Sequence, residues 1–247
     1  MGREPQILAC SGRPRWPEGS PPPELAGAQV RQAMRLSGAA RPRVCMVPTA
    51  MGDWPQVIEG WYAGGPSLGA AELSHLQLYP QPNVPDPRAH LMAQDVIFVW
   101  GGSVVNLLAL WRAHRLDEIM HECWQAGVVL AGGSAGSLCW HRFGVTDSFS
   151  DALDPLANGL GFLPFSNGVH DDAADQPRRT MFRELIAAGT LPDGYATEDG
   201  TGLHYVGTSL HEALSIVPGQ RAWRVRRADG GGYTETALPT RHWLPPR

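Results

Sequence analysis

One stretch decides the fold of this 247-residue chain: VVLAGGSAG, residues 128–136. Its first four residues form an apolar run that predicts a buried strand, and the residues after Ser134 have helical character. A strand, a tight glycine turn, a serine and a helix make up a nucleophile elbow, which lifts a reactive hydroxyl above the edge of a sheet. We therefore predict that Ser134 is a catalytic nucleophile. The alternative is a glycine-rich turn that holds its serine incidentally.

The same turn would supply hydrogen-bond donors to a reaction intermediate. The amide of Ala135, at the start of the predicted helix, would point to where a tetrahedral oxyanion forms. Gly101 and Gly102 end the strongest strand candidate, Asp95–Trp100, and Gly102 would supply the second donor of the oxyanion hole. The competing role of these glycines is a strand-to-helix turn with Ser103 as the helix N-cap, and both roles can hold at once.

Apolar strand candidates alternate with helix candidates over the first half of the chain. This alternation predicts an α/β fold with a mostly parallel central sheet and helices on both faces. After Ser134 the pattern changes to short alternating runs that are typical of C-terminal antiparallel edge strands. We expect residues 1–247 to form one domain, because no repeat, charge run or linker divides the chain.

The predicted strands are residues 6–10, 44–48, 76–79, 95–100, 128–131, 165–169, 194–197, 203–206, 214–217 and 222–225. The predicted helices are residues 24–36, 106–111, 116–125 and 177–188, with another that opens at 137–141.

Bulk properties narrow the classes of function. A net charge of −4 offers no electrostatic footprint for nucleic acid. No run approaches the ~20 apolar residues of a membrane span, and the N-terminus lacks the apolar stretch of a signal peptide, so we expect a cytoplasmic protein. The four cysteines form no CxxC pair. Three of them lie in or beside apolar runs, which favours buried free thiols over disulfides or a zinc site, and we expect no metal or cofactor.

A catalytic serine needs a base within hydrogen-bond reach, usually an imidazole oriented by a carboxylate. Of the nine histidines, His170 differs from the rest because it follows the predicted strand 165–169 and precedes two aspartates. A catalytic base and a structural histidine both fit His170 on the residues alone. The remaining candidates are His114, His121 and His141 on predicted helices, where a solvated face is expected, and His204 and His211 near the ends of late strands.

The carboxylate that would orient the base has five candidates: Asp171, Asp172, Asp175, Glu198 and Asp199. Catalytic groups gather at the carboxyl ends of strands in an open parallel sheet, which favours the last two, after strand 194–197. The resulting order of serine, histidine and acid differs from the serine, acid and histidine of α/β-hydrolases, so the chain does not fit that fold.

Two segments, VWGGSVVNLL (99–108) and AGGSAGS (131–137), resemble the peptidase E family of serine peptidases. Its founding members are α-aspartyl dipeptidases, and cyanophycinase is a relative. The likeness continues through further segments and covers about residues 6–225. It implies a fold close to that of class I glutamine amidotransferases, whose own activity requires a cysteine where this chain has Ser134. The further matching segments are residues 160–163, 170, 183–185 and 195–200.

The resemblance implies Ser134 as nucleophile, His170 as base and Asp199 as the third member of a triad. Characterised dipeptidases have a glutamate at this third position, and a backbone shift must make up for the shorter aspartate. Glu198 would point to the opposite face of an extended segment. A second departure is Ser103-Val104, where many relatives have Asn-Thr.

The resemblance also implies a substrate-binding arginine. Aspartyl dipeptidases hold the β-carboxylate of the substrate with an arginine shortly before an Arg-Glu-Leu sequence, and Arg178 lies five residues before Arg183. A planar guanidinium can bind a carboxylate through two parallel hydrogen bonds. The alternative is an exposed arginine in the first turn of a helix, and the neighbouring Arg179 leaves the register open.

The implied function is hydrolysis of short peptides by a serine peptidase, with N-terminal aspartyl dipeptides as the first candidate substrates. One alternative is a cyanophycinase-like or other small-amide hydrolase, and another is a catalytically idle binding domain that keeps the elbow for structural reasons. A homodimer is among the expected assemblies. Whether a neighbouring subunit completes the site stays open, as does the choice of substrate side chain.

Overall fold

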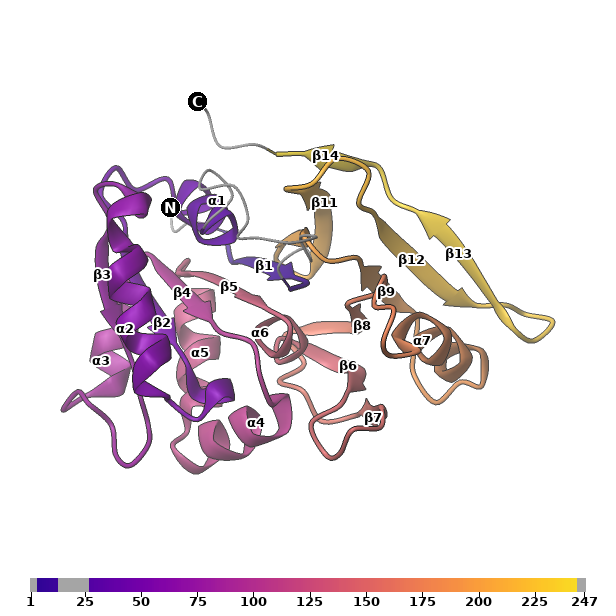
Figure 1. Ribbon diagram of the computed structural model, residues 1–247, viewed down its shortest axis with the longest axis horizontal. Helices are drawn as coiled ribbons and strands as arrows, with labels where there is room; N and C mark the ends of the chain where they lie inside the picture. The colour runs from indigo at the N-terminus through magenta and orange to yellow at the C-terminus, as the bar shows by residue number, and fades with distance from the viewer. Residues whose placement is uncertain (1–3, 13–26, 244–247) are drawn as a thin grey trace.

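The computed structural model describes residues 4–12 and 27–243, whose strands form two sheets (Figure 1). The first sheet has the strand order β14-β11-β10-β1-β5-β4-β2-β3. Its strands are β1 (Gln6–Cys10), β2 (Arg43–Val47), β3 (Glu72–His75), β4 (Val96–Val99), β5 (Val129–Gly133), β10 (Thr201–Val206), β11 (Ser209–Ser215) and β14 (Thr240–His242). The five strands from β1 to β3 run parallel, whereas β10 is antiparallel to β1 and β11 is antiparallel to β10.

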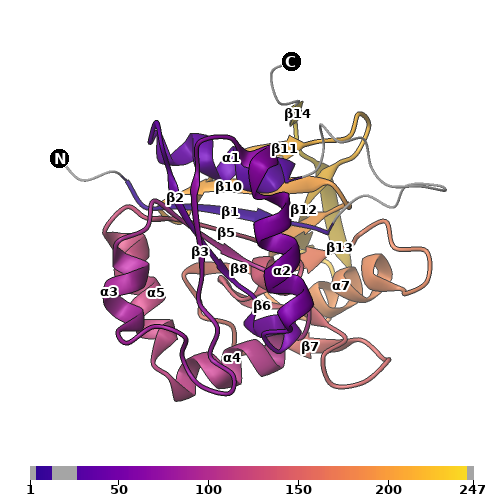
Figure 2. The same cartoon turned by 60° about the vertical axis from the view of Figure 1, so that its left-hand side comes forward.

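The parallel strands are apolar because both of their faces are covered. In β4, Ile97 and Val99 face one apolar cluster, while Val96 and Phe98 face another. Helices α1 and α2 pack over the face of Val96, and α3, α4 and α5 pack over the face of Ile97 (Figure 2). The helices are α1 (Ala28–Ser37), α2 (Pro55–Gly64), α3 (Pro87–Met92), α4 (Val104–Ala113), α5 (Leu116–Gln125), α6 (Ala135–Leu138) and α7 (Arg178–Ala187), with short 3-10 turns η2 (Thr49–Met51) and η3 (Gly65–Leu68).

The second sheet has the order β13-β12-β9-β8-β6-β7 and extends to the right-hand end of Figure 1. Strands β6, β8 and β9 run parallel, and α7 packs against this sheet. The predicted α/β fold with a mostly parallel sheet is therefore confirmed, but the late strands divide between two sheets. The strands are β6 (His141–Thr146), β7 (Asp154–Leu156), β8 (Leu163–Val169), β9 (Gly194–Thr197), β12 (Ala222–Arg227) and β13 (Tyr233–Ala237).

The third predicted strand is misplaced, because β3 covers Glu72–His75 rather than residues 76–79. One carboxylate oxygen of Asp53 accepts hydrogen bonds from the amides of Leu78 and Tyr79, at 2.6 and 2.8 Å. Leu78 is still buried in the core, which accounts for its apolar signal. These amides are thus bonded to a side chain from another part of the chain instead of a neighbouring strand.

Two other boundaries differ from the prediction. The predicted strand at 214–217 is β11, which ends at Ser215 because the Ser215 hydroxyl bonds both the amide and the carbonyl of Val217 and starts a turn. The helix after Ser134 is only the four-residue α6, and His141 begins strand β6 instead of lying on a helix. The predicted start of the first helix, residues 24–26, lies outside the described residues.

All four cysteines are free and buried, as the sequence predicts. Within the described ranges, each helix is too short or too polar to cross a membrane.

Candidate active site

Ser134 occupies a tight turn between β5 and α6. Its backbone has φ 55° and ψ −113°, a combination that a residue with a side chain rarely adopts. The flanking glycines make this turn sterically possible. A Cβ at Gly132 would overlap the carbonyl oxygen of Gly136, and a Cβ at Gly136 would overlap the carbonyl oxygen of Val99 in β4. The turn therefore has the strand, strain and close backbone packing of a nucleophile elbow.

Two backbone amides beside Ser134 are available as donors. Gly101 and Gly102 follow β4, which pairs with β5, so that a Cβ on Gly101 would lie 3.8 Å from Ser134 Oγ. Gly102 has φ 131° and packs against Ala50, where a side chain would not fit. In the described part of the chain, the amides of Gly102 and Ala135 donate no hydrogen bond. The Ser103 hydroxyl caps α4, so the N-cap role of this turn is also present.

His170 lies at the end of β8 and bonds to the serine. Its Nε2 is 2.9 Å from Ser134 Oγ, and its Nδ1 is 2.5 Å from Asp199 Oδ1. A carboxylate can only accept, so Nδ1 carries the hydrogen and Nε2 presents its lone pair to the serine hydroxyl. The three predicted triad residues are thus joined by two hydrogen bonds, although they come from three separate parts of the sequence.

The two neighbouring acids after β9 point in different directions. Asp199 is buried beside His170. Glu198 instead accepts a hydrogen bond of 2.8 Å from the amide of Arg221 and one of 3.4 Å from the indole of Trp223. The turn that follows Asp199 is anchored to the segment after β1, where the Gly200 amide donates to the Gly12 carbonyl at 3.0 Å.

The residues that hold the base in position are given no such role by the sequence analysis. The hydroxyl of Ser11, at the end of β1, accepts a 3.0 Å hydrogen bond from the His170 amide and donates to the Thr197 carbonyl at 2.7 Å. A Cβ on the neighbouring Gly12 would overlap the His170 ring. Asp172 accepts from the Asp199 amide at 2.8 Å. Their one detectable feature is that polar or glycine residues follow a buried central strand.

Arg178 is buried rather than exposed, with 7% of its surface accessible. Its Nη2 lies 2.5 Å from a carboxylate oxygen of Asp147, and its Nε donates to Gln176 at 2.7 Å. In the described ranges, its Nη1 has no hydrogen-bond partner. Ser148, the residue after Asp147, accepts a hydrogen bond from the amide of Val104 at 3.0 Å. This bond ties the loop that contains Asp147 to the start of α4, the helix that follows Gly102.

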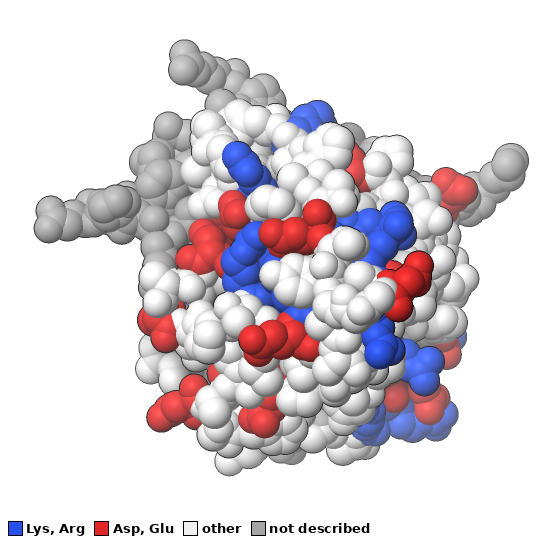
Figure 3. Space-filling model, turned by 90° about the vertical axis from the view of Figure 1, so that its right-hand side faces the viewer, with Lys and Arg blue, Asp and Glu red and all other residues white. Residues whose placement is uncertain are grey.

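The neighbouring arginines belong to a separate network on α7. Arg183 pairs with the buried Asp171 at 2.7 Å and with Glu235 of β13 at 2.6 Å. Arg179 bonds the same two acids at 2.6 and 2.7 Å. On the face that contains α7 and β13, basic and acidic side chains accordingly lie side by side (Figure 3). Arg179 is thus paired with Asp171 and Glu235, whereas Nη1 of Arg178 has no hydrogen-bond partner among the described residues.

His141 is a core histidine and not a solvated one. It is fully buried, with Nδ1 2.9 Å from the Ser137 carbonyl and Nε2 3.3 Å from the Tyr205 hydroxyl. Burial lowers the pKa of His141 from 6.5 to about 4, against a smaller opposing effect of the Ser137 carbonyl. Burial also raises the pKa of the Cys10 thiol to about 12, so this cysteine beside Ser11 is not a thiolate at neutral pH.

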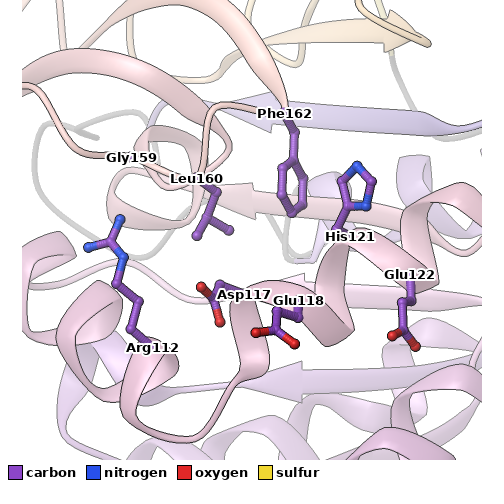
Figure 4. A pocket seen from close by; sticks show the side chains of 8 residues that line it. All are labelled: Arg112, Asp117, Glu118, His121, Glu122, Gly159, Leu160 and Phe162. Atoms are coloured by element: carbon purple, nitrogen blue, oxygen red, sulfur yellow. The ribbon is translucent and has the colours of Figure 1, made fainter.

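Two surface depressions among the described residues are lined by polar side chains. One, of about 440 Å³, is formed by the loop from Asp171 to Thr180 directly after His170. The other, of about 390 Å³, lies along α5 and is lined by His121, by the neighbouring Phe162 and by three acidic side chains (Figure 4). Glu118 pairs with Arg115 and Glu122 with Arg88. None of the three triad candidates lines this second depression, so it is separate from the candidate active site.

Sequence comparison relates the chain to peptidases. The family model of peptidase family S51 matches residues 26–213. The uncharacterized peptidase YgaJ of Bacillus subtilis (strain 168) is 39% identical over 211 residues, which cover 85% of this chain and 88% of the relative. Peptidase E of Shewanella denitrificans (strain OS217) is 30% identical over 149 residues, which cover 58% of this chain and 63% of the relative.

Solved structures share the fold. A peptidase from an acI-B1 Actinobacterium aligns over 96% of this chain and 95% of its own, with a TM-score of 0.63 and 16% identity. A putative peptidase E protein from Listeria monocytogenes EGD-e aligns over 87% of this chain and 100% of its own, with a TM-score of 0.59 and 15% identity. On the sequence matches, this chain is a peptidase and belongs to peptidase family S51, the family of peptidase E.

Proposed function

We propose that this peptidase is a serine-type dipeptidase that works through an acyl-enzyme intermediate, with Ser134, His170 and Asp199 as its triad. One observation carries the proposal: the hydrogen-bonded chain from Ser134 Oγ through the His170 ring to Asp199 Oδ1, with distances of 2.9 and 2.5 Å. A nucleophile joined to a base that a third group orients is the arrangement that activates a hydroxyl at neutral pH.

The chemistry follows from these contacts. Ser134 Oγ attacks the scissile carbonyl carbon while His170 Nε2 takes its proton. The carbonyl oxygen becomes an oxyanion, which the amides of Gly102 and Ala135 stabilise. His170 then gives the proton to the leaving amine, and the carbon–nitrogen bond breaks to leave an ester on Ser134. Water, deprotonated by His170, attacks the ester and restores the free serine, while Asp199 holds the imidazole in one tautomer throughout.

We assign dipeptides with N-terminal aspartate as the substrates, with Arg178 as the residue that binds their β-carboxylate. Asp147 and Gln176 fix two of its nitrogens, so the guanidinium is preorganised, and no residue in the described ranges bonds Nη1. The bond between Ser148 and Val104 ties the loop that holds Arg178 to the helix that follows Gly102.

Two experiments test the proposal. A fluorophosphonate probe should label the wild-type protein on Ser134 and leave the Ser134→Ala variant unlabelled, since only an activated serine reacts. An unlabelled wild type would support the idle binding domain. A panel of Asp-X, Glu-X, Asn-X and Ala-X dipeptides should then show the highest kcat/KM for Asp-X. Labelling without any Asp-X preference would leave a serine hydrolase with another substrate, as in the small-amide hydrolase alternative.

A further inference from the structure

A β-bulge between β10 and β11, near the β14 edge of the first sheet, brings two histidines and a glutamate together. In the pairing of β10 with β11, His204 lies opposite Glu212 and Tyr205 lies opposite Leu210, so His211 is the extra residue of the bulge. A bulge can turn two consecutive side chains toward the same face. His211 and Glu212 both approach His204 as a result, and one donor atom from each of the three residues lies within 4.8 Å of the others. Figure 2 shows β10 and β11 beside α1.

The hydrogen bonds of His204 leave one of its nitrogens without a partner. Nε2 lies 2.9 Å from Oε1 of Gln6, and the Gln6 amide nitrogen donates to the Leu36 carbonyl, which fixes the orientation of that amide. An amide oxygen only accepts, so the hydrogen of His204 is on Nε2 and the lone pair is on Nδ1. The His204 side chain is only 6% exposed, and within the described residues its Nδ1 has no hydrogen-bond partner.

The unpartnered nitrogen faces another acceptor. Oε1 of Glu212 lies 3.8 Å from His204 Nδ1, which is too long for a hydrogen bond. The ring of His211 is edge-on to that of His204, with centroids 5.2 Å apart. A buried lone pair beside a carboxylate is unfavourable, and a cation between the two would satisfy both.

We propose that His204 Nδ1, His211 and Glu212 bind a divalent transition-metal ion, with Zn²⁺ as the best match. Two imidazoles and one carboxylate form a donor set that zinc accepts. Zinc–ligand distances of about 2.0–2.2 Å bring tetrahedral donors roughly 3.3 Å apart. The observed 3.8 Å between His204 and Glu212 is close to this spacing, and the exposed His211 can rotate to complete it. Gln6 serves as the outer partner that fixes the tautomer of a ligating histidine.

The ion would stabilise the sheet and not take part in the peptidase reaction. β10 begins at Thr201, directly after the turn that contains Asp199, and runs away from the triad. His204 is therefore roughly 15 Å from that turn at the rise of a strand. Bound zinc would link β10 to β11 across the bulge, where the hydrogen-bond ladder is interrupted.

Zinc titration of the tag-free full chain, stripped with a chelator, tests the proposal. We expect one equivalent to bind with high affinity in calorimetry. His211→Ala, at an exposed position, should weaken binding at least tenfold, and Gln6→Leu should weaken it about tenfold. The matched control is His121→Ala, which removes another exposed histidine that has glutamates nearby and should leave the affinity unchanged. Zinc at about 100 times its Kd should raise the Tm on the order of 5–10 °C in the wild type but not in His211→Ala.

A further variant tests the place of Glu212. Arg241 bonds both oxygens of this carboxylate, at 2.9 and 3.0 Å, and competes with the ion for it. Arg241→Gln should therefore tighten zinc binding several-fold. Failure of the wild type to bind, or equal losses in His211→Ala and His121→Ala, would overturn the proposal. An unchanged affinity in Arg241→Gln would remove Glu212 from the ligand set. These readouts do not depend on peptidase activity, so they stand apart from the proposed function.

Discussion

Ser134, at the end of β5 in the first sheet, is positioned by glycines and backbone. His170 and Asp199, at the ends of β8 and β9 in the second sheet, are positioned by hydrogen-bonded side chains, one of which is Ser11 of the first sheet. On the serine side, Gly102, Gly132 and Gly136 allow the backbone to pack where a Cβ would overlap a carbonyl oxygen. On the histidine side, the buried Asp171 and Arg183 bond each other beside α7. The buried His141, at the start of β6, bonds the Ser137 carbonyl of α6.

This difference determines how each side should respond to change. The serine side depends on the absence of side chains, so added atoms should disrupt it. A change of pH should affect it little, because glycines and backbone groups do not titrate in this range. The histidine side depends on charge, tautomer and hydrogen bonding, so isosteric substitutions and acid should disrupt it with little change in shape.

The largest expected effect comes from the two residues that bond each other across the two sides, Ser134 and His170. Ser134→Ala and His170→Ala should each lower kcat by roughly 10⁴- to 10⁶-fold, because nucleophile and base act as one unit. For the same reason the double variant should be no worse than either single one. Steady-state kinetics on the best dipeptide, with circular dichroism to check folding, measures both. A tenth of wild-type activity in Ser134→Ala would exclude the serine mechanism.

The next effect separates two adjacent acids on the histidine side. Asp199→Asn should lower kcat about 10⁴-fold, because an amide can hold His170 in the wrong tautomer while keeping the same shape. Glu198→Gln should change kcat less than threefold, a margin on the order of ordinary surface substitutions, because this carboxylate bonds Arg221 and Trp223 instead. The reverse ranking in kcat would mean that Glu198 orients the base.

A smaller effect concerns substrate choice. Arg178→Ala should lower kcat/KM for Asp-X dipeptides about a hundredfold and leave Ala-X nearly unchanged, because only the aspartyl side chain uses the guanidinium. Arg178→Lys should restore little, since an ammonium lacks the planar fork. Arg226→Ala, at an exposed arginine on β12, is the control and should leave both substrates unaffected. Equal losses on both substrates in Arg178→Ala would point to a structural role through Asp147.

The contrast also accounts for what the sequence could predict. The elbow and the parallel strands have local signals, since glycines and apolar runs act on their immediate neighbours. The positioning of His170 has no local signal, because Ser11, whose hydroxyl bonds the His170 amide, lies 159 positions away in the sequence. The misplaced third strand has a similar cause, because Asp53 lies 25 positions before the Leu78 amide that it bonds. His141 was expected on an exposed helix face, yet α6 ends after one turn and the chain enters the core.

That buried histidine gives the smallest of the expected effects, a loss of stability in acid. The folded-state pKa of His141, about 4, is below the ordinary value of 6.5, because burial disfavours the charged ring. The unfolded chain therefore takes up a proton first as the pH falls from about 6.5 toward 4. Stability is complete above this window and declines through it.

Between pH 7.5 and pH 5, His141 alone should lower the free energy of unfolding by about 2 kcal/mol. His141→Gln keeps a donor for the Ser137 carbonyl but cannot titrate. In urea unfolding, its free energy of unfolding should therefore fall by about 2 kcal/mol less than that of the wild type between pH 7.5 and pH 5. The control is His242→Gln, at an exposed position on β14, which should lose stability in acid as the wild type does. Equal acid sensitivity in His141→Gln and the wild type would mean that the folded-state pKa of His141 is close to its ordinary value. The histidine side of the fold would then tolerate acid as well as the serine side, and the contrast between the two sheets would be limited to catalysis.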